Sequence, residues 1–300
     1  MTAAVADTVW KRGRFDARSG PGKLLFGRMY EDAAIELGVF RPGGRVFCIA
    51  SAGCTAMALA PHHEVVAVDI NPVQLGYAAR RFAGERGERG AAERFLALAR
   101  SFAPLVGWRR SRLRAFLELE DPGEQIVYWR TYLDTARFRT AFDGLLSLAA
   151  LRRVYAAPFL DFLPLRFGAV MRRRMERCFG LHANRTNPYA RALLLGDLPD
   201  DSPPPQARDI RLVQADAAAF LEREPAGSFV GFALSNILDG ATLQYRSRLG
   251  AAVRRAAAEG AQVVMRSFRE APASLGANRA ADDRAMLWGI VDAGPAARLS

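Results

Sequence analysis

Small residues and one acid recur in residues 45–72 at the spacing that a nucleotide site requires. The loop Ser51-Ala-Gly53-Cys-Thr55 follows an apolar run at 45–50, and a second apolar run at 64–69 ends in Asp69. Glycine and small neighbours let a backbone approach a ligand closely, and the amides that open the next helix attract negative charge. A carboxylate at a strand tip can accept hydrogen bonds from both hydroxyls of a ribose. We therefore predict a nucleotide site formed by Ala50, Ser51, Gly53, Asp69, Ile70 and Gln74.

Two later apolar runs are also followed by polar residues. Asp216 and Ala217 follow one of them, and Ser235 and Asn236 follow the other. Ligands of open α/β sheets bind at the carboxyl ends of the strands, so we expect all four residues to face one crevice. The first loop lacks the full GxGxxG pattern of a dinucleotide site, which favours S-adenosylmethionine (AdoMet) as the ligand. Asp216 would accept a hydrogen bond from its adenine amino group, and Ser235 and Asn236 would bind its methionyl carboxylate or amine.

Strand signals lie on both sides of a long stretch of helical sequence. Helical periodicity dominates residues 73–180, with stretches at 91–102, 124–148 and 167–179. Two strands, a helical stretch and three or four further strands predict an α/β fold with a doubly wound sheet. More specifically, we expect a Rossmann-like sheet of the class I AdoMet-dependent transferases with a large helical insertion between its second and third strands. The expected strands are 45–50, 64–69, 210–215, 229–234, 261–266 and 286–291.

The same pattern predicts how the chain divides. Residues 41–80 and 209–300 would form the AdoMet-binding domain, and residues 81–208 a helical insertion that binds the acceptor. Residues 1–40 would be an N-terminal helical segment. Three consecutive prolines at 203–205 predict an extended linker at 197–209.

The composition limits the classes of partner and location. The 300 residues carry a formal net charge of +11, nearly all of it from arginine, which favours anionic partners such as a lipid surface. The three cysteines and three histidines have no zinc-ligand spacing, so no metal is expected. Sparse cysteine, no apolar N-terminal signal and no apolar run of about 18 residues predict a cytoplasmic protein that meets a membrane only at its surface.

Several short blocks resemble one family. Ile49-Ala-Ser-Ala-Gly-Cys54 and Val66-Ala-Val-Asp69-Ile-Asn71-Pro72 resemble the AdoMet:diacylglycerol 3-amino-3-carboxypropyl transferases, a BtaA-like family that makes the precursor of betaine lipids. Upstream, Leu25-Phe-Gly27-Arg-Met-Tyr30-Glu31-Asp32 is similar to the family pattern Y-G-x-x-W-E-D-P. Further blocks follow in the family's order and extend the resemblance over most of the chain: Asn187-Pro-Tyr189, Leu195-Gly196, Leu234-Ser-Asn-Ile237, Asp283-Arg284 and Trp288-Gly289.

Three positions depart from the family's pattern. Tyr30 replaces a tryptophan, Ala33 a proline, and Thr55 the asparagine that usually follows Gly-Cys. These departures leave the expected fold and AdoMet site unchanged, and they concern the identity of the acceptor.

The resemblance implies transfer of the 3-amino-3-carboxypropyl group to a hydroxyl of diacylglycerol or a related lipid, with release of methylthioadenosine. A hydroxyl is a weak nucleophile and benefits from a base within hydrogen-bond reach. The family motif suggests Glu31 and Asp32 as candidate bases, although this acidic pair could instead hold Arg28. Asp239 and Tyr245 are further candidates, with helix capping and simple packing as their alternatives.

Residues 142–170 and the basic cluster at 171–177 mix apolar and arginine side chains, as a segment at a lipid surface does. An amphipathic core helix with a solvated arginine face has the same pattern. Two other functions also fit parts of the sequence. An AdoMet-dependent methyltransferase would share the fold, and a nucleic-acid-binding protein would use the positive charge, but no nucleic-acid recognition motif is present. We therefore expect no specific nucleic acid as a partner; the sequence does not fix the oligomeric state.

Overall fold

The computed structural model describes residues 21–152, 160–161, 163–197, 202–272 and 278–299. Its centre is a six-stranded mixed sheet of order β3-β2-β1-β4-β5-β6, in which neighbouring strands are parallel except β5 and β6. The chain is therefore an α/β protein, compatible with a Rossmann-like fold. The strands are β1 (Arg45–Ile49), β2 (Glu64–Asp69), β3 (Arg211–Gln214), β4 (Phe229–Ala233), β5 (Ala257–Ser267) and β6 (Ile290–Pro295).

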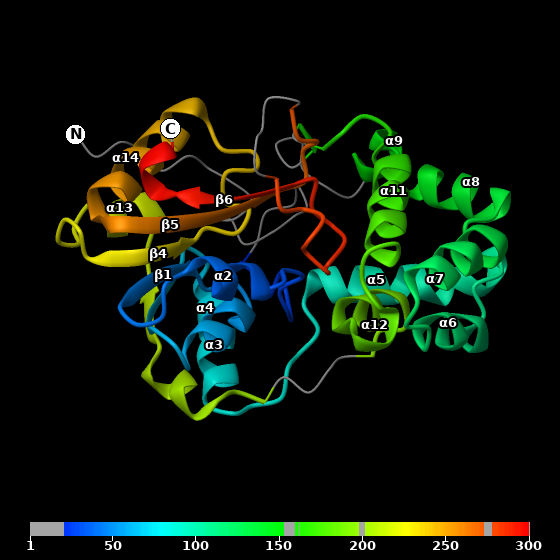
Figure 1. Ribbon diagram of the computed structural model, residues 1–300, viewed down its shortest axis with the longest axis horizontal. Coiled ribbons are helices and arrows are strands. Elements are labelled where there is room, and N and C mark those ends of the chain that lie inside the picture. The colour runs from blue at the N-terminus through cyan, green and yellow to red at the C-terminus, as the bar shows by residue number, and fades with distance from the viewer. Residues whose placement is uncertain (1–20, 153–159, 162, 198–201, 273–277, 300) are drawn as a thin grey trace.

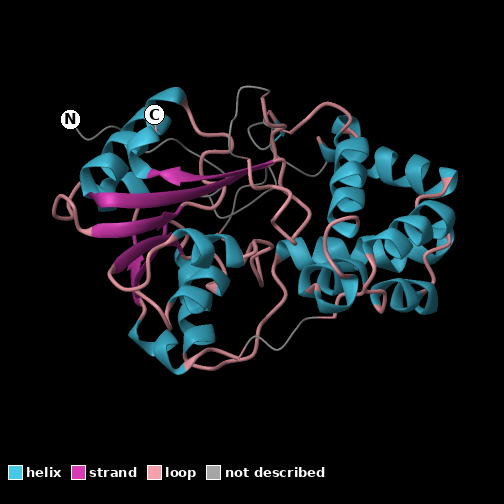
Figure 2. Cartoon of the chain, viewed as in Figure 1, coloured by secondary structure: helices cyan, strands magenta, loops and turns pink. Residues whose placement is uncertain are grey.

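Helices cover both faces of this sheet (Figure 1, Figure 2). One face packs on α2 (Ala34–Val39), α3 (Cys54–Leu59) and α4 (Pro72–Phe82), and the other on α13 (Ala217–Leu221) and α14 (Leu243–Ala256). Alternate residues of β1 explain the two faces, because Val46 and Cys48 lie in the first core and Phe47 in the second. Both faces of the central strands are therefore buried, as in other parallel sheets.

Between β2 and β3, the part of the chain that the structure describes is helical beyond α4. Most of these helices lie beside the sheet and away from it in Figure 1. They have a core of their own, which includes Trp108, Phe116, Trp129 and Phe179. The helices are α5 (Ala91–Ser101), α6 (Arg110–Leu117), α7 (Pro122–Tyr128), α8 (Ala136–Leu145), α9 (Leu148–Leu151), α11 (Phe167–Phe179) and α12 (Pro188–Leu194), with shorter turns η1 (Ala103–Val106), η2 (Trp129–Leu133), η3 (Asn184–Thr186), η4 (Pro205–Asp209) and, after β6, η5 (Ala296–Arg298).

Local capping explains where several helices begin. The Asn71 side chain accepts hydrogen bonds from the amides of Val73 and Gln74, and Pro72 occupies the first position of α4. Thr135 caps α8 in the same way, and the chain leaves helical geometry at Asp134. The stretch predicted as helical at 124–148 is therefore mostly helical, but α7, a π turn and α8 divide it.

Other sequence predictions also differ from the structure. Residues 21–33 form irregular backbone, and α2 is the helix found in the described part of the predicted N-terminal helical segment; residues 1–20 lie outside that part. Pro205 begins the 3-10 turn η4 where an extended linker was predicted, and 198–201 are not described. The last strand is Ile290–Pro295 and not 286–291. The described residues include no helix long and apolar enough to cross a membrane.

The basic cluster at 171–177, for which the sequence left a lipid-facing segment and an amphipathic core helix as alternatives, forms bonds within the protein. Arg174 is buried and donates to the carbonyl oxygens of Leu287, at 2.6 Å, and Phe268, at 2.8 Å. Arg177 donates to the carbonyl oxygen of Ala280 at 2.8 Å. Arg172 and Arg173 pair with acids. These bonds fasten α11 to the segment between β5 and β6, so α11 is an amphipathic structural helix.

Candidate active site

A cavity of about 670 Å³ lies where the carboxyl ends of the strands face the helices between β2 and β3. Four strands contribute a polar residue at or just beyond their ends: Ser51 after β1, Asp69 of β2, Asp216 after β3 and Ser235 after β4. The other walls are mostly apolar. The cavity therefore has a polar end at the sheet and an apolar end among the helices.

Two serines mark the point at which the strand order reverses. Ser51 and Ser235 follow the neighbouring strands β1 and β4, and both adopt left-handed backbone, with φ of 43° and 53°. Such φ values are uncommon for residues other than glycine, and strained backbone is concentrated at functional sites. In open α/β sheets, ligands bind at this reversal point. The two serines therefore identify the polar end of the cavity as the candidate binding site.

Asp69 holds the backbone of this crevice together. One carboxyl oxygen accepts from the Ser51 amide at 2.9 Å, and the other accepts from the Asn71 amide at 2.8 Å. Burial raises the pKa of Asp69 to about 6, and these amide hydrogen bonds oppose the increase. Each oxygen keeps a lone pair, so the carboxylate can still accept from two ligand hydroxyls.

Asp216 and Tyr245 form a pair on the far side of the crevice. The Tyr245 hydroxyl donates to Asp216 at 2.8 Å, and the other Asp216 oxygen accepts from the Ala219 amide at the start of α13. Burial, followed by the charge and hydrogen bond of Asp216, raises the pKa of Tyr245. Tyr245, predicted as a candidate base, therefore remains protonated and acts as a hydrogen-bond donor. The adenine-binding role predicted for Asp216 remains compatible with its position in the wall.

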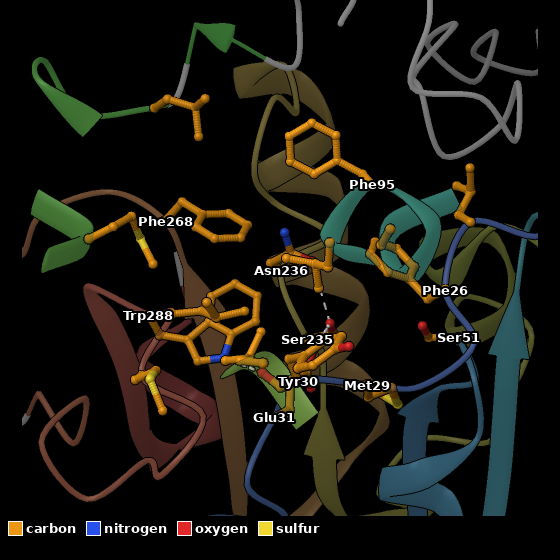
Figure 3. A pocket seen from close by; sticks show the side chains of 18 of the residues that line it. Phe26, Met29, Tyr30, Glu31, Ser51, Phe95, Ser235, Asn236, Phe268 and Trp288 are labelled. Carbon is orange, nitrogen blue, oxygen red and sulfur yellow. Dashed lines mark hydrogen bonds between the residues drawn. The ribbon is translucent and has the colours of Figure 1, made fainter. Parts of the chain in front are cut away.

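Glu31 lies on the cavity floor beside Ser235 (Figure 3). The Ser235 hydroxyl donates a hydrogen bond to the Glu31 carboxylate. Burial raises the pKa of Glu31 to about 7, while Arg266 and Ser235 oppose the increase and Glu36 and Asp283 add to it. A carboxyl group with a pKa near neutrality can accept a proton at physiological pH.

Below Glu31, Arg266 is surrounded by acids and fully buried. It pairs with Glu36 through two nitrogens, with Asp283 at 2.9 Å, and lies 3.6 Å from Glu31. Asp32, next in the chain, pairs instead with Arg284. With four acids and two arginines, the cluster would carry two negative charges if every group were ionised. This excess explains in part why protonation of Glu31 is favoured.

Segments distant in the sequence meet around residues 30–32. The Tyr189 hydroxyl donates to the Glu31 carbonyl at 2.7 Å, and the Trp288 indole donates to the Tyr30 carbonyl at 2.9 Å. Asn187 donates to the Arg284 carbonyl at 3.0 Å. These residues belong to the blocks on which the family resemblance was based. The blocks therefore form one interlocked structure that supports the floor of the cavity.

The apolar end of the cavity is lined by aromatic and long aliphatic side chains. In Figure 3, Phe26 lies on one side of Ser235 and Asn236, and Phe268 and Trp288 lie on the other. Phe95 lies above them in the same view. Further out, the walls come from α5, η1, α8, α9 and α11 through residues such as Phe138, Phe142, Leu151, Phe167 and Met171. This end provides a large surface for an apolar group and few hydrogen-bond partners.

Twelve predicted site residues can now be located relative to the cavity. Those that line it are Glu31, Ser51, Asp69, Ile70, Gln74, Asp216, Ala217, Ser235, Asn236 and Tyr245, whereas Asp32 and Asp239 do not. Gln74 also binds the backbone of Leu25 and Phe26. Asp239 accepts from Ser267 and from the Phe268 amide, so it does not cap α14, whose cap is Thr242. Neither acid is therefore placed as the base.

Ala50 and Gly53, the two other predicted contacts, do not line the cavity either. Gly53 has φ of 83°, and a Cβ there would lie 2.5 Å from the Phe82 ring. The turn and the packing against α4 therefore account for glycine at this position.

Sequence reasoning missed the residues that position Glu31. Arg266 and Glu36 belong to ordinary strand and helix sequence, and no local pattern marks them as partners. Their pairing is visible only in the tertiary structure, because 230 positions of sequence separate them. The aromatic walls Phe95 and Phe268 were also missed, because an isolated phenylalanine looks like any core residue.

Comparisons with known proteins identify no relative: no family model, curated protein or solved structure matches the chain. The candidate site is therefore interpreted from its own geometry and chemistry.

Proposed function

We propose that this protein transfers the 3-amino-3-carboxypropyl group of AdoMet to the hydroxyl of a lipid acceptor, diacylglycerol or a related molecule. The observation that carries the proposal is the single cavity that joins a polar crevice at the strand ends to an apolar chamber among the helices. A nucleoside co-substrate fits the first part, and acyl chains fit the second.

The donor set of the polar end suits AdoMet. Asp69 would accept from the ribose hydroxyls, Asp216 from the adenine amino group, and Asn236 would bind the methionyl group. The charge of the cavity wall also suits AdoMet. Three acids line the described cavity wall, Glu31, Asp69 and Asp216, against one arginine, Arg100. This negative balance favours a ligand that carries a sulfonium cation.

When bound, AdoMet supplies a carbon activated by its sulfonium: the acceptor oxygen bonds to Cγ, and the broken C–S bond leaves its electron pair on methylthioadenosine. The released hydroxyl proton goes to Glu31, whose pKa near 7 suits it to accept one. Ser235 fixes the Glu31 carboxyl by hydrogen bonding, and Arg266 supports it from below. The aromatic walls exclude water, which would otherwise compete as an acceptor.

The nucleoside product tests this proposal directly. Purified protein would be incubated with AdoMet and diacylglycerol vesicles, and both the nucleoside and the lipid would be followed by mass spectrometry. We expect methylthioadenosine together with a lipid heavier by one aminocarboxypropyl group. S-adenosylhomocysteine with a methylated product would instead establish a methyltransferase, and absence of AdoMet binding would refute both.

A further inference from the structure

An apolar strip lies at the outer edge of the cavity on α5, η1 and α8. Leu98 and Phe102 are 59% and 57% exposed, and Leu145 is 43% exposed, although all three also line the cavity. Leu105, in η1, is 69% exposed and does not line it. The turn η1 contacts α8, so the two parts of the strip are adjacent. We call these four residues the cavity rim.

The rim continues the apolar surface of the cavity out to the molecular surface. Large exposed apolar side chains are common singly, but side chains that gather at the mouth of an apolar cavity indicate an interaction site. An acyl chain entering here would pass from one apolar environment to another without contact with water.

Arginines accompany the rim on both helices in the same arrangement. Arg94 and Leu98 of α5 and its C-cap residue Phe102 follow at intervals of four residues, and in α8 so do Arg137, Ala141 and Leu145. Residues four apart lie on one face of a helix, so the exposed Arg94 lies one turn from Leu98. The exposed Arg137 lies two turns from Leu145. This combination of apolar side chains and nearby cations is typical of segments at an anionic lipid surface.

The acids of these helices do not cancel that charge. Glu93 is buried and accepts from the Gly27 and Gly90 amides, each at 2.8 Å. Asp143 is paired with Arg172 at 2.8 Å. The surface charge around the rim is therefore positive, which complements anionic headgroups.

We propose that the cavity rim docks on an anionic lipid bilayer, with Leu98, Phe102, Leu105 and Leu145 inserted among the acyl chains and Arg94 and Arg137 at the headgroups. The proposal rests on the lipid acceptor proposed above, and it adds the route by which that acceptor reaches the cavity. It also assigns membrane contact to α5, η1 and α8, whereas the sequence suggested residues 142–177, which include α11 but only the end of α8.

Vesicle binding tests the docking surface in the absence of AdoMet. The full chain would be sedimented with vesicles of phosphatidylglycerol or of phosphatidylcholine. We expect binding to the anionic vesicles that weakens at high salt. Leu105→Asp should weaken this binding about tenfold or more, and Arg94→Glu with Arg137→Glu should do so by at least about tenfold at low salt.

A matched control is Leu243→Asp, since Leu243 is 83% exposed on α14 and lies at the other end of the molecule from α8 (Figure 1). This variant should bind vesicles as the unaltered protein does. Thermal unfolding would verify that each variant is folded. Equal binding by the Leu105 and Leu243 variants would overturn the proposal, as would a dimer in solution that Leu105→Asp dissociates, because a second copy would then cover the rim.

The two proposals fail independently. If the protein binds vesicles through the rim but releases no methylthioadenosine, docking stands and the proposed reaction is wrong. If methylthioadenosine is released but Leu105→Asp leaves both vesicle binding and turnover of vesicle-held diacylglycerol unchanged, the reaction stands and docking is wrong.

Discussion

The Ser235 hydroxyl donates a hydrogen bond to the Glu31 carboxylate across 204 positions of sequence. Ser235 has left-handed backbone at the end of β4, and the Glu31 carboxylate lies 3.6 Å from the buried Arg266 guanidinium. The pair joins a strained strand end to an acid whose pKa lies near neutrality. That relationship is the basis of the catalytic role proposed for Glu31.

Glu31→Gln should slow turnover about 10²- to 10⁴-fold, the usual range for loss of a general base. Glutamine can still accept the hydrogen bond from Ser235, and Asp69 and Asp216 still line the cavity, so AdoMet affinity should fall far less than turnover. Steady-state kinetics and calorimetric titration of AdoMet would separate the two effects. A variant with unchanged turnover would exclude Glu31 as the base.

The reaction should depend on pH through Glu31. The ionised carboxylate is the form that accepts a proton, so kcat/KM should rise with pH and level off above about 7. The residual activity of Glu31→Gln should lack this step. If kcat/KM of the Glu31→Gln variant changed at the same pH, the titrating group would be another residue.

The same group should affect stability in the opposite direction. Glu31 has a pKa of about 7 in the folded protein, above its ordinary value of 4.5, so the folded protein binds the proton more tightly. Its stabilising contribution is complete below pH 4.5 and is lost as pH rises to about 7. Urea unfolding across this interval should show a smaller fall in unfolding free energy for Glu31→Gln, and an equal fall would contradict the pKa shift.

Asp69→Ala should weaken AdoMet binding about a hundredfold or more, because it removes the acceptor of two ribose hydroxyls and frees the Ser51 amide. Asp282→Ala is the control, since that side chain is 53% exposed and pairs with Arg279. Calorimetric titration would compare both variants. Normal AdoMet binding by Asp69→Ala would show that the site is wrongly assigned.

Ala99→Trp should fill part of the apolar chamber, because Ala99 lines the cavity on α5. We expect an increase in KM for long-chain diacylglycerol of about tenfold or more, with AdoMet affinity unchanged. Ala97→Trp, on the same helix but outside the lining, should have little effect on KM. If both variants raised the KM for diacylglycerol equally, the apolar chamber would not be the acceptor-binding site.

Much of the α/β scaffold could be read from local sequence. Strand runs such as 64–69 are short, apolar and bounded by turns, and Asn71-Pro72 predicts the start of α4 by a capping mechanism that needs no distant partner. Asp69, Asp216 and Ser235 were found because strand ends converge in any parallel sheet. The break within the helical stretch 124–148 was not predicted, since Thr135 can be accommodated in a helix and becomes a cap only when the chain leaves helical geometry at Asp134.

The sequence by itself determined five of the six strands, their polar ends and the helical character of the segment between β2 and β3, because these depend on residue periodicity and local hydrogen bonding. Only the tertiary structure decided which acid faces the cavity. Asp32 and Glu31 are adjacent and chemically alike, but Arg284 binds one and Ser235 the other. Likewise, the arginines of α11 reach buried carbonyl groups and acids, whereas Arg94 donates to the exposed Arg89 carbonyl and stays at the surface. Burial and distant partners set the pKa and availability of a charged group, and no local pattern contains them.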